Sequence, residues 1–162
     1  MSGATSTTGG ARRRRPNPYR PLRARRLTAQ LIVLTVAEVL LFASYADHDA
    51  RFHWAAHFLV GVIAAAAWLS AYLLIASRPA PGQVLTALWF HLAAAAPDLL
   101  FRLGVPHYHW MDLFLGHVAV HYIPGGDVTW LVLAVIALTG YAIQLSRWLT
   151  ARHRQSLTAP TD

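Results

Sequence analysis

Residues 54 to 77 read WAAHFLVGVIAAAAWLSAYLLIAS, an apolar stretch that contains no aspartate, glutamate, lysine or arginine. A helix needs about 20 mainly apolar residues to cross a hydrocarbon core of roughly 30 Å. The stretch is therefore predicted to span a membrane as one helix. It stops at residues 78 to 82, RPAPG, where two prolines and a glycine predict a tight turn.

Three further apolar runs, at residues 27–46, 84–101 and 128–149, lie on either side of this stretch. Together the four runs predict an all-α fold, an integral membrane four-helix bundle. Pro97 is expected to kink or end the third helix. The apolar piece at 110–123 is too short for a comfortable span and is followed by PGG. We predict that it forms a short re-entrant or interfacial helix between the third and fourth spans.

The composition is that of a membrane protein with a single domain. Of 162 residues, 56% are hydrophobic and 13% charged, whereas soluble domains carry about 25% charged residues. The absence of cysteine and lysine excludes disulfides, thiolate metal sites and lysine nucleophiles. We expect a disordered, Arg-rich cytoplasmic tail at 1–26, one transmembrane helical domain at 27–150 and a cytoplasmic tail at 151–162.

The net charge of +7 comes from arginines that flank the apolar runs. If both termini are cytoplasmic, Arg51 and Arg102 lie outside and the other twelve of the fourteen arginines lie inside. This is the positive-inside bias that sets the orientation of membrane proteins. We predict a multi-pass protein of the cell membrane, surrounded by the lipid bilayer. No nucleic-acid partner is expected, because no basic face carries stacking aromatics.

The first apolar run allows two interpretations. The RR pair at 25–26 and the sequence SYA at 44–46 also resemble a twin-arginine export signal with a small-residue cleavage site. We favour a retained span, because the run is long for a signal core and contains Glu38. Glu38 and His91 lie near the middle of predicted spans, where an unpaired charge is costly. They are expected to hydrogen-bond to each other, with a proton path as the alternative.

Histidines and aspartates gather on or near the predicted external face: Asp47, His48, Asp49, His53, His57, Asp98, His107, His109, Asp112, His117, His121 and Asp127. Imidazole and carboxylate suit zinc, manganese or iron, and histidines four residues apart share one face of a helix. His53 with His57, and His117 with His121, have that spacing. On one helix from His109 to His121 the polar side chains would cover about half the circumference, so some would not bind the ion directly.

Asp98 is the sharpest single candidate, because it follows Pro97 near the end of an apolar run. It is interpreted as a metal ligand or general base, or else as a cap of the following turn. The alternative for the whole cluster is that interfacial histidines lie at headgroup depth, as amphipathic side chains do. The tryptophans that flank the runs, Trp54 among them, are assigned to such an aromatic belt.

Three motifs follow one another: HFLVG at 57–61, the pair PD at 97–98 after a hydrophobic stretch, and then downstream histidines. This order resembles the YdjM-like family of predicted membrane-bound metal-dependent hydrolases over about residues 53–121. By that resemblance the metal ligands would be His57, Asp98 and His107 or His117. The family pattern has a second aspartate where this chain has Leu100, and Asp112 could supply that carboxylate.

The sequence leads to the hypothesis of an extracytoplasmic divalent-metal site, zinc or manganese, in a hydrolase that acts on a lipid-like substrate. The candidate metal ligands are His57, Asp98, His107, His117 and His121. Asp112 would be the general base or a further ligand. Two alternatives stay open. One is a metal- or haem-binding subunit without hydrolytic activity, with haem held by two of His57, His91 and His117. The other is a structural or partner-binding membrane protein without an ion.

Overall fold

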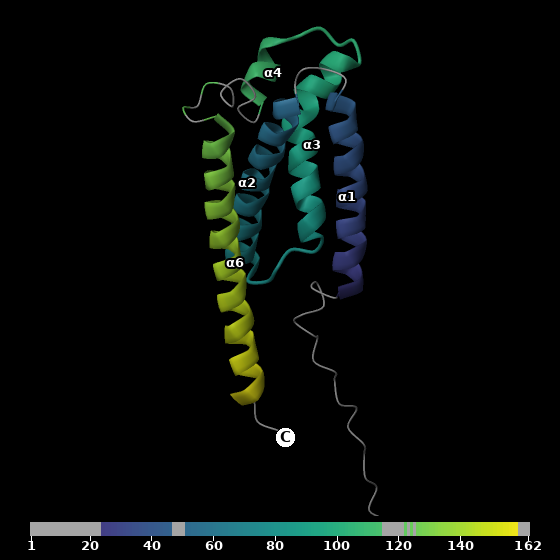
Figure 1. The fold of residues 1–162 in the computed structure, drawn as a ribbon. Coiled ribbons are helices and arrows are strands. Elements are labelled where there is room, and N and C mark those ends of the chain that lie inside the picture. Colours follow the sequence, from purple (N-terminus) through teal and green to yellow (C-terminus); the bar gives the residue numbers. More distant parts are fainter. Residues whose placement is uncertain (1–23, 47–50, 115–121, 123, 125, 159–162) are drawn as a thin grey trace, which may run out of the picture.

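The computed structural model describes residues 24–46, 51–114, 122, 124 and 126–158. Every regular element in these residues is a helix, and four of the helices are long and apolar enough to cross a membrane. The predicted all-α, four-helix architecture is therefore confirmed. In chain order the helices are α1 (Ala24–Ala46), α2 (Arg51–Ala76), α3 (Gln83–Arg102), the short α4 (His109–Leu113) and α6 (Gly126–Thr158) (Figure 1).

The tight turn predicted between the second and third spans is present. Gly82 caps the start of α3 with φ 76°, a left-handed conformation that glycine adopts at little steric cost. Pro97 lies inside α3, and the helix continues beyond it to Arg102. Pro97 therefore does not end the helix. The last helix, α6, runs to Thr158, past the end of the apolar run, and its final turns are polar.

The short α4 stands where an interfacial helix was predicted, between the third and fourth spans. It ends at Leu113, and Phe114 has an extended backbone with φ −67° and ψ 114°. A single helix from His109 to His121, for which the angular spread of the histidines was considered, is interrupted at Phe114. Because the backbone leaves the helical path there, the angular spacing of one helix does not relate His109 to the later histidines.

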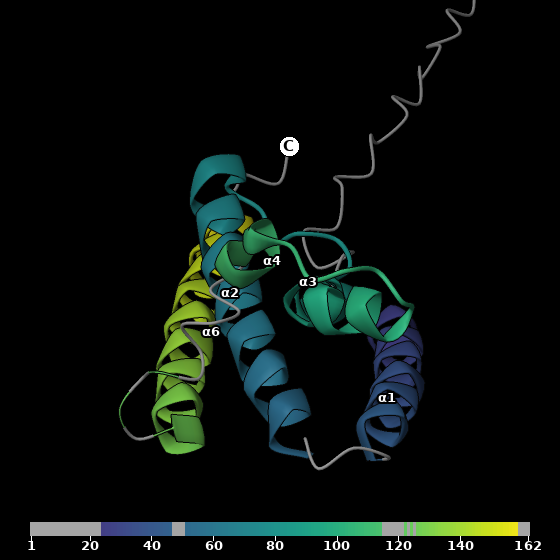
Figure 2. The same ribbon diagram turned by 90° about the horizontal axis from the view of Figure 1, so that it is seen from above.

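Helix α2 is the centre of the arrangement, since it packs on α3, on α6 and on α1 (Figure 2). Its buried residues include Ala56, Gly61, Ala65 and Ala66, and small residues let membrane helices approach closely. At Gly61 the approach is closest, because a Cβ built there would lie 2.6 Å from both the Cα and the backbone nitrogen of His91. Gly61 therefore brings the backbones of α2 and α3 together at the level of His91.

Replacing Gly61 by alanine is expected to lower the free energy of unfolding by about 1 to 3 kcal/mol, because the added methyl group meets backbone that cannot rotate away. Gly140→Ala in α6 is the matched control, since a Cβ there meets nothing within 4 Å. Alanine is the better helix former, so the control should be neutral or more stable by up to about 1 kcal/mol. Unfolding in detergent micelles measures both variants. Equal stability of the two would contradict the close approach.

Polar contacts also join the two outer helices to this pair. On one side, Trp148 Nε1 of α6 donates a 2.8 Å hydrogen bond to the carbonyl of Ser77, just after α2. On the other side, α1 contacts α3 at its two ends and its middle. Gln30 Oε1 accepts a hydrogen bond from the Val84 backbone nitrogen at 3.2 Å, Glu38 bonds His91, and Arg102 donates to the carbonyl of Ser44. These polar contacts fix α1, whose apolar window is only 6% buried.

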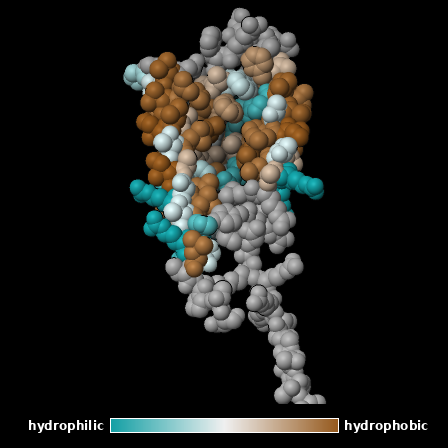
Figure 3. All heavy atoms as spheres, turned by 60° about the horizontal axis from the view of Figure 1, so that its bottom comes forward, coloured by the Kyte–Doolittle hydropathy of each residue, from teal (hydrophilic) through white to brown (hydrophobic). Residues whose placement is uncertain are grey.

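The outward-facing side chains of the spans are largely apolar. Large hydrophobic residues are exposed along α1 and α6, and hydrophilic residues gather toward the lower end of the flanking helices (Figure 3). In water such a surface would aggregate, whereas lipid tails solvate it. The helices are thus suited to a lipid bilayer, as predicted.

Candidate functional site

Two predicted site residues, far apart in sequence, meet near the end of α3. His57 Nε2 of α2 lies 3.0 Å from Asp98 Oδ2 of α3. The helical repeat explains the meeting. His57 lies one turn from Gly61 on the face of α2 that packs on α3, and Asp98 lies two turns beyond His91 on α3. His57 is 1% exposed and Asp98 22% exposed, so the carboxylate is the member of the pair that solvent can reach.

A second histidine–aspartate pair lies beyond the end of α3. His107 Nε2 is 3.0 Å from Asp112 Oδ1 in α4, and both side chains are partly exposed. A surface pocket of about 360 Å³ connects the two pairs, because it is lined by Pro97, Asp98, Phe101 and His107. Asp98 and His107 therefore face a common space, and their partners His57 and Asp112 are not among the residues that line it.

The structure covers only part of the predicted site, namely His57, Asp98, His107 and Asp112. His117 and His121 lie outside the described residues, as do Asp47, His48 and Asp49, and the side chains of His53 and Asp127 are not described either. Within the described residues, no three histidine, aspartate or glutamate side chains are grouped closely enough to hold a metal ion. The described structure thus contributes two pairs at one pocket.

Each pair has a defined chemical capacity. A carboxylate bonded to an imidazole fixes the orientation and the tautomer of the ring, so the other ring nitrogen can bind a proton or a metal ion. For His107 and Asp112 that leaves Nδ1 of His107. In the other pair the roles are reversed, because His57 is buried and Asp98 lines the pocket. His57 there holds the Asp98 carboxylate in place.

A third pair lies deeper in the bundle. His91 Nδ1 is 2.8 Å from Glu38 Oε1, which confirms the hydrogen bond expected between these two residues. His91 is 0% exposed, and its backbone packs directly against Gly61 of α2. No residue of this pair lines the Asp98 pocket. The Glu38–His91 pair is therefore separate from the external site.

The structure corrects the sequence-based assignment of Trp54. Trp54 was placed in the interfacial belt, but its Nε1 is buried and has no hydrogen-bond partner among the described residues. Its ring stacks on Phe58, with centroids 5.5 Å apart, and meets Phe42 edge to face at 5.4 Å. Position at the start of a span predicts an interfacial tryptophan, and hydropathy carries no signal for the direction in which the ring turns.

Comparison with known proteins leaves the family of this chain open. No family model, curated protein or solved structure matches it. The resemblance to the YdjM-like hydrolases therefore stays a prediction that rests on motif order. Its four apolar helices characterise the chain as a multi-pass membrane protein.

Proposed function

We propose that the pocket at the end of α3 binds a divalent metal ion, with Asp98 and His107 as direct ligands. The observation that carries this proposal is the pocket itself, which brings together one carboxylate and one imidazole from separate His–Asp pairs. Histidine nitrogen and carboxylate oxygen are the donors that zinc and manganese accept. His57 and Asp112 would orient the two ligands, the usual task of residues behind a metal site.

Two ligands alone would hold such an ion weakly, and structural zinc sites usually have four ligands. We propose that His117 and His121 complete the site. They are the remaining histidines of the segment that follows α4, and their spacing would let them bind one ion from one helical face. The alternative donor is water, which catalytic metal sites keep in an open position.

The reaction that fits such a site is metal-dependent hydrolysis. A bound divalent ion lowers the pKa of a coordinated water and polarises a carbonyl or phosphoryl oxygen. In this chain the Asp98 and His107 side chains would hold the ion, while the Asp112 carboxylate would accept a proton directly. The substrate would be lipid-like, because the pocket lies at one end of helices with lipid-facing apolar surfaces.

We further propose that this end of the bundle is extracytoplasmic. The start of α1 and the end of α6 lie at the opposite end from α4 (Figure 1). Arginines accumulate beside those two helix ends, which favours a cytoplasmic location for both. In this orientation α1 is a retained helix, since Glu38 is the partner of a histidine buried in the bundle.

Metal analysis of the detergent-purified protein, together with its absorption spectrum, tests the proposal. We expect about one zinc or manganese ion per chain after purification without chelator, and loss of that ion on dialysis against chelator. A chain that neither retains nor takes up either ion would overturn the proposal. A Soret band without a divalent ion would instead favour haem binding.

A further inference from the structure

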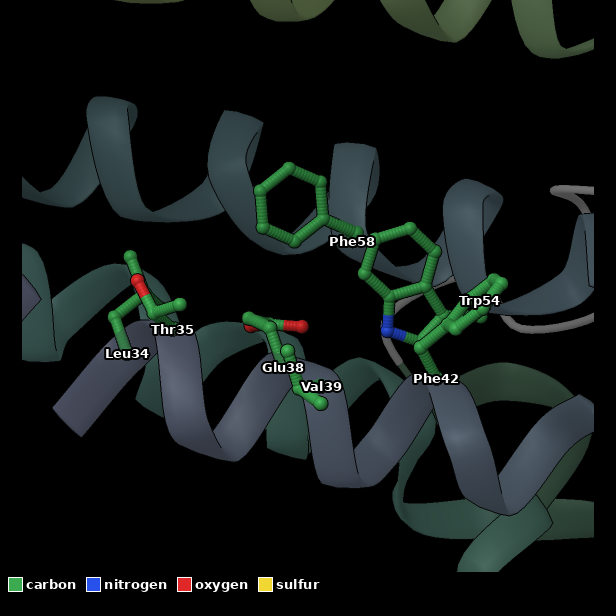
Figure 4. Close-up of a pocket in the computed structure, with 7 residues that line it drawn as sticks. All are labelled: Leu34, Thr35, Glu38, Val39, Phe42, Trp54 and Phe58. Atoms are coloured by element: carbon green, nitrogen blue, oxygen red, sulfur yellow. The ribbon is translucent and has the colours of Figure 1, made fainter. Parts of the chain in front are cut away.

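Two further pockets share no lining residue with the Asp98 pocket. One lies between α1 and α2 and has mainly apolar walls, which suit lipid tails (Figure 4). The other, the α6 pocket, has a volume of about 250 Å³ and lies toward the end of the bundle opposite α4. Two arginines, two residues with hydroxyl groups and one alanine line it: Ser146, Arg147, Thr150, Ala151 and Arg154.

The α6 pocket faces away from the rest of the bundle. At roughly 100° per residue, its lining residues fall within about 140° of the helix circumference. The side chains with which α6 packs on α2 near this end lie on the other side of the helix, namely Tyr141, Leu145 and Trp148. All the lining residues are exposed. The pocket is therefore open to whatever surrounds this part of α6.

The arginines of the α6 pocket lie at the level of the lipid headgroups. Residues 128–146 carry no charged side chain and, at about 1.5 Å per residue, cover nearly the ~30 Å of a hydrocarbon core. Arg147 directly follows this run, and Arg154 lies about 10 Å further along the helix axis. The end of α2 gives the same level, because Trp148 Nε1 bonds the carbonyl of Ser77, just beyond the apolar span of α2. The last turns of α6 thus extend into the headgroup layer, past the turn that joins α2 and α3 (Figure 1).

The α6 pocket is positively charged, and no carboxylate of α6 neutralises it. Residues 128–158 contain no aspartate or glutamate. A third arginine, Arg152, lies on the inner side of the helix. Its Nη2 is 3.5 Å from the carbonyl oxygen of Ser77, and its guanidinium carbon is 5.6 Å from the centre of the Trp148 ring. Arg152 therefore attaches α6 to α2, whereas the two arginines of the pocket carry their charge on the outer face.

An apolar track on the same face of α6 continues from the pocket into the span. Val132, Ile136 and Ile143 fall within the angular range of the pocket and are 51%, 62% and 48% exposed. Gly140 lies on this face too, and a Cβ built there would meet nothing within 4 Å. A molecule whose anionic group enters the pocket can therefore lay a hydrocarbon chain along this track.

We propose that the α6 pocket binds the phosphate of an anionic phospholipid, with an acyl chain along the apolar track. The planar guanidinium of Arg147 can donate two parallel hydrogen bonds to phosphate oxygens, and Arg154 adds a second cation. The Ser146 hydroxyl is a further donor, whereas the Thr150 hydroxyl donates to the Ser146 carbonyl at 3.0 Å within the helix. A zwitterionic lipid brings its own cation close to the arginines. A lipid without that cation, such as phosphatidylglycerol, should therefore bind more tightly.

Native mass spectrometry of the full chain in detergent with chelator tests this binding. The probes are phosphatidylglycerol and phosphatidylcholine with identical acyl chains. The first phosphatidylglycerol should bind with a dissociation constant at least about fivefold lower than that of phosphatidylcholine, the ratio expected for one arginine at a charged headgroup. Glycerol phosphate, which has the phosphate but no acyl chain, should not displace the lipid even in excess. This comparison uses the wild-type protein and does not depend on the folding of a variant.

Arg147→Gln removes one charge and the paired donors from the pocket. It should weaken binding of phosphatidylglycerol about tenfold or more, because hydrogen bonds to charged groups are among the stronger ones. The matched control is Arg78→Gln, which removes an exposed arginine at the same end of the bundle but outside the pocket. It should bind as the wild type does. In lipid nanodiscs, phosphatidylglycerol with a diazirine in its acyl chain should label peptides of residues 128–146 in the wild type and the control, and much less in Arg147→Gln.

Three results would contradict the proposal: equal binding of the two lipids, equal losses in Arg147→Gln and Arg78→Gln, and displacement of the lipid by glycerol phosphate. Equal losses would show a general attraction to the positive surface, and displacement would show a site for a soluble phosphate. None of these measurements involves a divalent metal ion, so the lipid site and the metal site at the other end of the bundle are tested separately.

Discussion

Loss of either partner of the Glu38–His91 pair is expected to lower the free energy of unfolding by about 1 to 3 kcal/mol, the cost of a buried polar group without a partner. In Glu38→Leu the fully buried His91 loses the contact at Nδ1, and its Nε2 already has no partner among the described residues. In His91→Leu the Glu38 carboxylate loses its contact in the same way. Reversible unfolding in mixed micelles, followed by circular dichroism, measures both changes.

The double variant Glu38→Leu with His91→Leu measures how strongly the two side chains are coupled to each other. When both partners become apolar, no buried polar group is left, and the loss should be smaller than the sum of the two single losses. The difference should be about 0.6 to 1.7 kcal/mol, the range found for side-chain hydrogen bonds within membranes. Additive losses would show that the two side chains are not coupled.

The expected consequence reaches beyond these two residues, because α1 has few other attachments. With little of its surface buried, α1 depends on polar contacts at three levels, and the Glu38–His91 pair is the one nearest the middle of the span. Weakening that contact should loosen α1 from α3 before the α2–α3 core unfolds.

Much of this fold was predictable because each spanning helix must by itself be long and apolar enough to cross the bilayer. Length and hydropathy identified the four long helices, and the turn at residues 78–82 followed from its prolines and glycine. The Glu38–His91 bond was also predictable, since two polar groups at similar depth in lipid have few other partners. Of the proposed ligands His57, Asp98 and His117, which were expected to converge, the first two meet, and His117 lies outside the described residues.

Other features depend on which faces of the helices pack together, and this cannot be read from the hydropathy of a single sequence. Hydropathy ranks α2 with the other spans, yet α2 lies at the centre because Gly61 and neighbouring alanines permit close packing. The break at Phe114 was missed because the segment is apolar on both sides of it. Trp54 was misplaced because its inward orientation depends on Phe42 from another helix.

Asp98→Ala is expected to abolish retention of the metal ion, because it removes the one carboxylate that lines the pocket at the end of α3 among the described residues. Removal of a supporting residue typically costs 10- to 100-fold in metal affinity, so loss of a direct ligand should exceed about 100-fold. His57→Phe should fall within the smaller range, since His57 is buried behind Asp98. Metal content of the purified variants, followed by zinc or manganese titration, provides the comparison.

Glu38→Gln supplies the matched control for Asp98. It removes a carboxylate that is also bonded to a buried histidine, but one that does not line the metal pocket, so the variant should bind the ion as the wild type does. Both variants should insert into membranes normally, because the apolar spans that drive insertion are unchanged. If Asp98→Ala retains its ion, or if Glu38→Gln loses the ion equally, then Asp98 is not a ligand. The His57–Asp98 pair would then serve to join α2 to α3, as the deeper pair joins α1 to α3.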